Sequence, residues 1–227
     1  MSQRINDTFT RIHGHYDFFN HLFSFGLDIL WRRDAARHSI ISKRRYRVLD
    51  VATGTGDLAI AISAEAKRSG KEAQIIGMDF NKYMLEHAEE KTRRLGLKNI
   101  RFEYGDALHM AYPDSYFDVV ASGFALRNFD SLKVFGREMK RVMKKGGTFV
   151  LLDMSKPDSN LNLTSFYFSI IRAIGSIVSK GSYKWLTSSI MNFDRNAAAE
   201  LLSKQGFKNV RVIRLISGIS FIITGNK

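Results

Sequence analysis

The residues best suited to chemistry in this sequence lie between positions 47 and 59. A short apolar run carries Asp50, and Gly54 and Gly56 follow it. Glycine lets the backbone turn sharply and approach a ligand where a β-carbon would clash. This order of strand, carboxylate, glycine turn and helix is typical of nucleotide-like cofactor sites at the carboxyl edge of a parallel sheet. Because Ala59 falls at the third position of the pattern G-x-G-x-x-G/A, a dinucleotide is an equally open ligand here.

Two more carboxylates close later apolar runs. Asp79 ends the run 73–79, 23 residues beyond Gly56. An acid at this place can accept hydrogen bonds from both ribose hydroxyls of a cofactor. Asp106 follows the run 100–104, where it can meet the exocyclic amine of an adenine. A turn or N-cap aspartate is the alternative interpretation of Asp106.

Alternating strands and helices must position these side chains. Apolar runs predict strands and amphipathic runs ended by glycine predict helices, so the alternation up to residue 153 predicts a parallel sheet with helices on both faces. The helix before the fifth strand is expected to stop at the turn Lys144-Lys145-Gly146-Gly147. After the first strand, the predicted helices are 57–68, 81–95 and 131–143, and the predicted strands are 73–79, 100–104, 116–123 and 148–153.

The two ends of the chain follow a different pattern. Residues 4–41 are rich in aromatics and predict two helices separated at Gly26. Residues 158–193 contain no acid after Asp158 and predict two or three inserted helices. A helix is then expected at 194–205. The two runs after it, 210–216 and 219–224, are separated only by Ser217-Gly218, and so short a loop permits only an antiparallel pair.

Length and composition indicate one globular domain. The chain has 227 residues, 44% of them hydrophobic, and no cysteine, which excludes disulfides and thiolate chemistry. The histidines show no metal-ligand spacing, so we expect no metal. No apolar run reaches transmembrane length, and residues 1–10 lack the apolar centre of a signal peptide. We therefore expect a cytoplasmic protein.

The positive charge is concentrated at the two ends. The formal net charge is +13, yet residues 48–153 carry 16 Lys and Arg against 15 Asp and Glu. Residues 1–47 carry 9 against 4, and residues 154–227 carry 10 against 3. Basic flanks of this kind attract nucleic acid or an anionic membrane surface. A compositional bias without function is the alternative.

A five-stranded parallel sheet with a closing antiparallel hairpin resembles the class I S-adenosylmethionine-dependent methyltransferases. That family has a Rossmann-like, seven-stranded, mostly parallel sheet with helices on both faces. Residues 48–57 look like its first motif, and Asp79, Asp106-Ala107 and the turn at 144–147 look like later ones.

Within that superfamily the sequence is similar to the ubiquinone/menaquinone biosynthesis C-methyltransferases, the UbiE/MenG group. The similarity spans residues 13–225. Its most specific elements are Leu126-Arg127-Asn128 and Ser155-Lys156-Pro157. Further matching segments are Tyr16-Asp17-Phe18-Phe19-Asn20, Ser24-Phe25-Gly26, Leu30-Trp31-Arg32 and Tyr183-Lys184-Trp185-Leu186-Thr187-Ser188-Ser189-Ile190.

The sequence departs from this group at two positions. Ala125 stands where the group usually has Gly, and Gly123 stands where it often has Ser. A contact to the cofactor at 123 must then come from the backbone, or from Ser122. Neither departure removes the cofactor site, but both leave the identity of the quinone open.

The resemblance implies transfer of a methyl group to a ring carbon of a reduced polyprenyl quinone. The ring becomes nucleophilic when a neighbouring hydroxyl loses its proton, and that charge needs stabilisation. Arg127 is the leading candidate, as an electrostatic stabiliser or through a bound water, because a guanidinium stays protonated. Asn128 and Tyr16 are expected to orient the ring hydroxyls. A surface or ion-pairing role is the alternative for Arg127.

The resemblance also implies a set of S-adenosylmethionine contacts. Asp79 binds the ribose, Asp50 organises the glycine turn near the methionine amino group, and Phe80 flanks the adenine unless it is simply core. The full set of expected cofactor residues is Asp50, Thr53, Gly54, Thr55, Gly56, Asp79, Phe80, Asp106, Ala107 and Gly123.

The expected organisation is a single methyltransferase domain in four parts. These are an N-terminal helical cap (1–45), the cofactor-binding core (46–153), a helical substrate insert (154–193) and a last helix with the hairpin (194–227). The expected partners are a polyprenyl quinol and, transiently, an anionic membrane surface that the basic cap and insert contact from the cytoplasmic side.

Three alternatives remain open from the sequence. The same core can methylate another small molecule, or RNA, as the basic character suggests. We expect no nucleic-acid partner, however, because no RNA-binding module is recognisable. A NAD-dependent oxidoreductase or a non-catalytic nucleotide binder is the third alternative, and Asp106 and the hairpin argue against it. A homodimer is neither indicated nor excluded.

Overall fold

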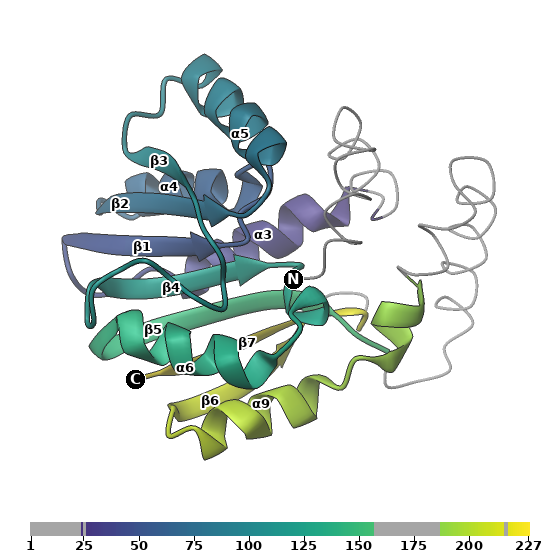
Figure 1. Ribbon diagram of the computed structural model, residues 1–227. Coiled ribbons are helices and arrows are strands. Elements are labelled where there is room, and N and C mark those ends of the chain that lie inside the picture. The colour runs from purple at the N-terminus through teal and green to yellow at the C-terminus, as the bar shows by residue number, and fades with distance from the viewer. Residues whose placement is uncertain (1–23, 25, 157–186, 216–217) are drawn as a thin grey trace, which may run out of the picture.

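The computed structural model describes residues 24, 26–156, 187–215 and 218–227 (Figure 1). Tyr16, the helix expected before Gly26 and most of the insert 154–193 lie outside the described residues.

The described residues form a seven-stranded sheet in the order β3-β2-β1-β4-β5-β7-β6 (Figure 1). The first five strands are parallel, and β7 runs antiparallel to both β5 and β6. The predicted Rossmann-like sheet and its closing hairpin are therefore confirmed. The strands are β1 (Arg45–Val51), β2 (Glu72–Asp79), β3 (Ile100–Tyr104), β4 (Phe117–Gly123), β5 (Met143–Met154), β6 (Lys208–Arg214) and β7 (Ser220–Asn226).

The helices begin at residues that can cap them. Asn81, Ser131 and Asp194 each accept a hydrogen bond from a backbone N–H of the first turn, which satisfies donors that a helix leaves unpaired. Gly26 precedes the first described helix with a φ of 74°, so this glycine marks a helix start as predicted. The helices are α3 (Leu27–His38), α4 (Asp57–Arg68), α5 (Lys82–Arg94), α6 (Leu132–Val142) and α9 (Arg195–Lys204), with a short 3-10 helix η2 (Leu126–Asn128).

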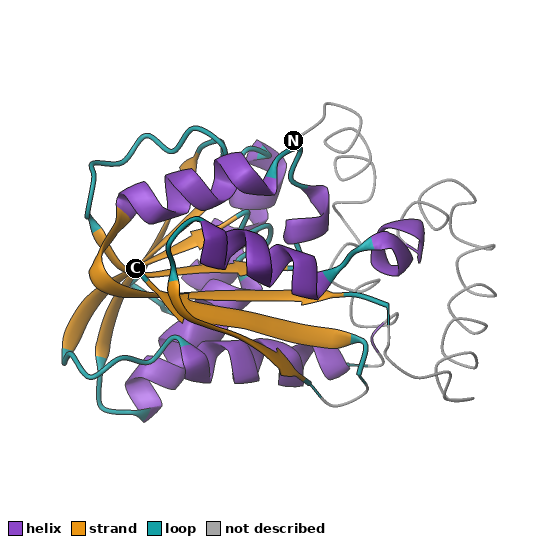
Figure 2. Ribbon diagram, turned by 90° about the horizontal axis from the view of Figure 1, so that it is seen from below, coloured by secondary structure: helices purple, strands orange, loops and turns teal. Residues whose placement is uncertain are grey.

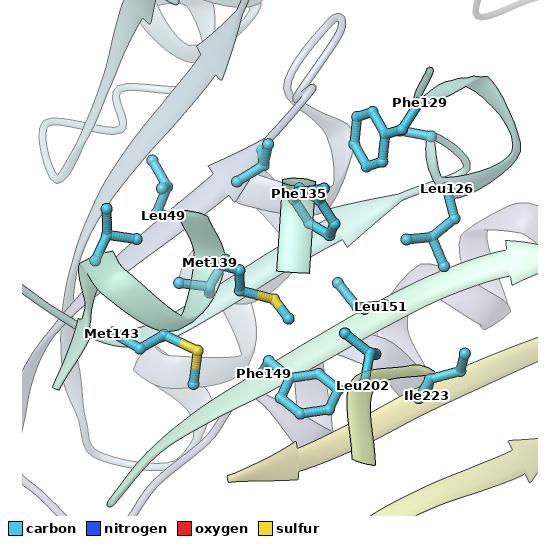
Figure 3. Close-up of a cluster of buried hydrophobic side chains, with 14 of the residues drawn as sticks. Leu49, Leu126, Phe129, Phe135, Met139, Met143, Phe149, Leu151, Leu202 and Ile223 are labelled. Atoms are coloured by element: carbon cyan, nitrogen blue, oxygen red, sulfur yellow. The ribbon is translucent and has the colours of Figure 1, made fainter. Parts of the chain in front are cut away.

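Helices cover both faces of the sheet (Figure 2). Because successive side chains of a strand point to opposite faces, Leu49 and Val51 of β1 lie in one buried cluster and Val48 lies in the other. The first cluster packs under α6 and α9, and the second packs under α3 and α4. Figure 3 shows the first cluster, where Phe135 and Met139 of α6 point at the sheet.

The segment Lys144-Lys145-Gly146-Gly147 differs from its prediction as a turn. Helix α6 ends at Val142, and these four residues lie inside β5. Two of them form backbone hydrogen bonds with Lys227. Gly146 N donates to Lys227 O and Lys227 N donates to Gly147 O, both at 2.9 Å. The pairing with β4 shifts between Phe117 and Val119, so the segment is an irregular strand with Gly146 at a φ of 74°.

Candidate functional site

The glycine turn is built around the buried carboxyl group of Asp50. Asp50 lies near the carboxyl end of β1 and is fully buried. Thr53 Oγ1 donates a hydrogen bond to its Oδ2 at 2.6 Å. Within the residues that the structure describes, its Oδ1 has no hydrogen-bond partner. Burial raises the pKa of Asp50 to about 7, against the opposing effect of the Thr53 hydrogen bond. The carboxylate is therefore held in a place where a cation would stabilise its charged form.

The two glycines of the turn are required for different reasons. Gly54 has a φ of 56°, and the space where a β-carbon would lie is open. Gly56 has a φ of 82°, and a β-carbon there would lie 2.9 Å from the Phe102 ring and 3.2 Å from Ala88. Gly54 thus leaves room above the turn, while Gly56 lets α4 start close to β3 and α5.

Asp79 joins β2 to the glycine turn. Gly54 N donates to its Oδ2 at 2.8 Å, and Asn81 N donates to its Oδ1 at 2.9 Å. Burial raises the pKa of this carboxyl group, while the backbone hydrogen bonds oppose the shift. A carboxylate has about four acceptor positions, so Asp79 can still accept a hydrogen bond from a ligand hydroxyl.

The carboxyl ends of β1, β2 and β4 lie at one edge of the sheet (Figure 1), and residues at or just after these ends line a hollow. It measures about 400 Å³, including the part open to solvent. Its lining residues are Ala52, Gly54, Asp79, Phe80, Asn81, Met84, Gly123, Phe124, Ala125 and Asn128.

Five of the residues predicted from the sequence line this hollow together. They are Gly54, Asp79, Phe80, Gly123 and Asn128. Asp50, Thr53, Thr55 and Gly56 belong to the adjoining turn without lining the hollow itself.

Asp106 and Ala107 are not brought into the hollow. Asp106 is exposed and accepts a hydrogen bond from Leu108 N at 2.9 Å, and His109 Nδ1 lies 3.4 Å from its Oδ2. This is the turn aspartate that the sequence allowed as the alternative. Contact between Asp106 and a cofactor stays a prediction.

The sequence missed two strained residues in the wall of the hollow. Ala52 has a φ of 54° and Phe124 a φ of 60°. Residues other than glycine rarely adopt such positive φ values. Ala52 and Phe124 follow the neighbouring strands β1 and β4, so both distortions lie where parallel strands end. Their position directly after a strand was the only available signal, since strain at functional sites leaves no trace in residue type.

The departures at 123 and 125 have local explanations. A β-carbon on Gly123 would lie 3.3 Å from Leu58 Cδ2, so a serine there requires the Leu58 side chain to move slightly. Ala125 has an ordinary φ of −114°, which accommodates its methyl group. Ser122 is fully buried and donates to Val51 O at 2.8 Å, so its hydroxyl does not reach the hollow.

Arg127 lies behind the wall in a buried ion pair. Its Nε donates to Asp153 Oδ1 at 2.5 Å, and its backbone N donates to Oδ2 at 3.2 Å. Its Nη1 donates to Ser189 Oγ at 3.1 Å, in the helical residues 187–192. The side chains of Arg127 and Asp153 are only 4% and 0% exposed. The ion-pairing alternative therefore describes what the guanidinium does in this structure.

Asn128, the next residue, lines the hollow and has one buried polar atom that no hydrogen bond from a described residue satisfies. It is buried, lines the hollow, and its Oδ1 has no hydrogen-bond partner in the part of the chain that the structure describes. A buried amide oxygen without a partner is costly, so a ligand hydroxyl or amine is expected to bind it.

Comparison with known proteins identifies the family. The ubiE/COQ5 methyltransferase family matches residues 1–227. The chain belongs to this family. The resemblance inferred from the sequence is therefore confirmed, and neither NAD chemistry nor RNA as the acceptor is favoured.

Relatives and solved structures agree with this assignment. A demethylmenaquinone methyltransferase of Deinococcus radiodurans is 39% identical over 99% of this chain and 93% of its own. One from Geobacillus kaustophilus is 36% identical over 99% of this chain and 97% of its own. A SAM-dependent methyltransferase from Aquifex aeolicus shares the fold at 20% identity with a TM-score of 0.64, covering 88% of this chain and 91% of its own.

Among the described residues, no cluster of His, Cys, Asp and Glu has the arrangement of a metal site. Within the same residues, none of the helices combines the length and apolar character needed to cross a bilayer.

Asp50→Asn is expected to separate stability from cofactor binding. The folded-state pKa of about 7 exceeds the usual 3.8, so folded protein holds a proton that unfolded protein has lost, and stability falls as pH rises from about 4 to 7. The amide removes this loss. Without cofactor, the variant should gain about 2–4 kcal/mol at pH 8 relative to wild type and much less at pH 5.

Chemical denaturation at both pH values measures this difference, and thermal shift with S-adenosylmethionine should be lost in Asp50→Asn. The control is Asp114→Asn, whose carboxylate is 76% exposed. A variant with the wild-type pH dependence contradicts the raised pKa of Asp50.

Proposed function

We propose that this protein transfers a methyl group from S-adenosylmethionine to a ring carbon of demethylmenaquinol, which yields menaquinol. The match over the whole chain to relatives named demethylmenaquinone methyltransferase carries the choice of acceptor. The hollow beside the glycine turn, with Asp79 on one wall and Asn128 on another, supports a site that holds donor and acceptor together.

Different residues around the hollow bind different parts of the donor. Asp79 accepts the ribose hydroxyls, and Asp50 provides the negative charge for the methionine ammonium group. Phe80 and Met84 line the hollow from the side of α5 and flank the adenine. When bound, the donor supplies an electrophilic methyl group on sulfur and leaves as S-adenosylhomocysteine.

Asn128 meets the acceptor. A ring carbon attacks a methyl group well only when an adjacent hydroxyl is giving up its proton, because the oxygen then pushes charge into the ring. The free Oδ1 of Asn128 accepts a hydrogen bond from this hydroxyl and fixes the ring. Holding carbon and methyl in line supplies much of the rate.

Arg127 acts from behind Asn128. Its guanidinium, held by Asp153, fixes η2 and adds positive potential near the oxygen as the proton leaves. Tyr16 is proposed to orient the second hydroxyl and lies outside the described residues. The hydroxyl proton leaves to water, and after methyl transfer the ring hydrogen is lost as a proton while the phenolate oxygen is protonated again, so one proton net is released for each C–CH₃ bond formed.

Asn128→Ala should lower kcat with labelled S-adenosylmethionine and reduced demethylmenaquinone by roughly 10–100-fold, because the hydrogen bond that orients the ring hydroxyl is lost. The affinity for S-adenosylhomocysteine should stay within about threefold, because Asn128 faces the acceptor. Asn192→Ala, an exposed amide, is the control. Unchanged kcat in Asn128→Ala removes this residue from the mechanism.

Measuring the contribution of Arg127 to kcat requires a variant that leaves no unpaired buried charge. Arg127→Ala alone strands Asp153, at a cost of about 3–5 kcal/mol in stability. The double variant Arg127→Gln, Asp153→Asn removes both charges and should lower kcat by roughly 10–100-fold. The exposed Arg137→Gln is the control. Wild-type turnover by the folded double variant would show that Arg127 is not part of the chemistry.

Attachment to an anionic membrane surface is proposed for the cap, since the quinol carries a long isoprenoid tail. On α3, Ile29 and Leu30 are 58% and 47% exposed, and Arg33 and Arg37 lie exposed one and two turns further along. Apolar side chains beside arginines suit the boundary between lipid headgroups and acyl chains. Residues 1–47 as a whole also carry a positive net charge, as the arginines of this surface do.

Vesicle flotation tests this surface. Wild type should bind phosphatidylcholine vesicles that contain phosphatidylglycerol more than vesicles without it, and high salt should reduce binding. The double variant Ile29→Glu, Leu30→Glu should lose binding, while Leu95→Glu, at another exposed apolar residue, should retain it. Binding that ignores lipid charge and salt contradicts the proposal.

A further inference from the structure

Arg32 is a buried cation for which the proposed chemistry has no role. It belongs to the segment Leu30-Trp31-Arg32 on α3 and is only 8% exposed. Its Nη1 forms an ion pair with Asp28 one turn earlier, and Asp28 also accepts a hydrogen bond from Ser24 Oγ at 2.6 Å. A charge buried this deeply needs such partners, so its position is fixed by more than packing.

The same guanidinium reaches the glycine turn through Asp57. Arg32 Nη2 lies 3.7 Å from Asp57 Oδ2, and Lys91 Nζ of α5 lies 2.7 Å from the other oxygen. Asp57 is the first residue of α4 and directly follows Gly56. Arg32 and Lys91 therefore hold, from two helices, the turn on which the open space above Gly54 depends.

Arg32 also lies against the opposite wall of the hollow. Its guanidinium carbon is 5.1 Å from the centre of the Phe124 ring, and the Trp31 ring centre is 6.3 Å from the same ring. Phe124 lines the hollow and has the strained φ of 60°, with its N–H bonded to Leu152 O at 2.7 Å. A strained backbone persists only where its surroundings determine it, and α3 supplies part of those surroundings.

We infer that Arg32 is a positioning residue for the cofactor site, which it reaches through Asp57 at the glycine turn and through the ring of Phe124. It touches neither donor nor acceptor. One guanidinium sets the distance between two walls of the hollow, and the cap helix α3 is thereby part of the cofactor site. The inference rests on the proposed function only in taking this hollow as the donor site.

Arg32 also acts on Asp50 through its charge. Burial raises the pKa of Asp50, and the positive charge of Arg32 opposes that shift. Removing the guanidinium therefore leaves the proposed partner of the methionine ammonium group more easily protonated. Easier protonation of Asp50 and displacement of the residues that line the hollow both weaken the binding of the donor.

Calorimetric titration with S-adenosylhomocysteine tests the inference without any acceptor. Because Arg32→Gln alone strands Asp28 and risks unfolding, the variant is Asp28→Asn, Arg32→Gln, which removes the buried pair. Its Kd should rise by about tenfold relative to wild type, the size of a typical coupling between distinct sites. The control Arg137→Gln, at an exposed arginine of α6, should change Kd by less than about twofold.

Phe124→Leu supplies the second arm. If Arg32 acts through this ring, the effects on binding free energy will not be additive. The triple variant Asp28→Asn, Arg32→Gln, Phe124→Leu will lose less binding free energy than the sum of the losses in Phe124→Leu and in the Asp28, Arg32 variant. A folded Asp28, Arg32 variant with a lower Tm and wild-type Kd overturns the inference, because Arg32 is then structural only. Additive effects overturn the route through Phe124.

Failure of the proposed function gives a different result. A wild-type protein that binds S-adenosylhomocysteine yet methylates no reduced demethylmenaquinone contradicts the acceptor, while the Kd differences between the Arg32 variants keep their meaning. Wild-type protein that fails to bind S-adenosylhomocysteine overturns both, because the hollow is then not the donor site.

Discussion

The buried carboxyl groups of Asp50 and Asp79 impose the constraint on which the site depends. They end neighbouring parallel strands, and burial raises the pKa of both. Backbone N–H groups of Gly54 and Asn81 satisfy Asp79, and the Thr53 hydroxyl satisfies one oxygen of Asp50. These bonds require the chain to turn tightly above the sheet, so the glycine conformations follow from the need to solvate two buried acids.

Stability and function therefore oppose each other at Asp50. An amide or an apolar side chain would be less costly at this place at neutral pH, since only the charged form suffers from burial. A bound ammonium group reverses the balance, because it stabilises the charged form. Retention of the acid is thus more readily explained by ligand binding than by folding, which agrees with the trade-off found in many active sites.

Much of the fold was predictable because its signals are local. Apolar runs ending in Asp50 and Asp79 gave the strands, and the short Ser217-Gly218 connection gave the antiparallel hairpin. The prediction of a turn at 144–147 was wrong because the backbone partner of this segment, Lys227, is distant in sequence. Phe124 and Ala52 were missed since their strain comes from tertiary contacts. Asp106 illustrates the opposite case, where a motif match does not bring the side chain into the hollow.

Two buried arginines frame the hollow from outside it. Arg127 pairs with Asp153 behind Asn128, and Arg32 pairs with Asp28 and Asp57 behind Phe124 and the glycine turn. A buried ion pair contributes little net stability compared with apolar side chains of the same volume, although breaking one is costly. Its advantage is direction, because a guanidinium forks to several partners in a fixed plane. Both pairs join a wall of the hollow to a helical segment outside the parallel core, α3 in one case and residues 187–192 in the other. Placement of these segments and the geometry of the cofactor site are therefore linked through charge as well as packing.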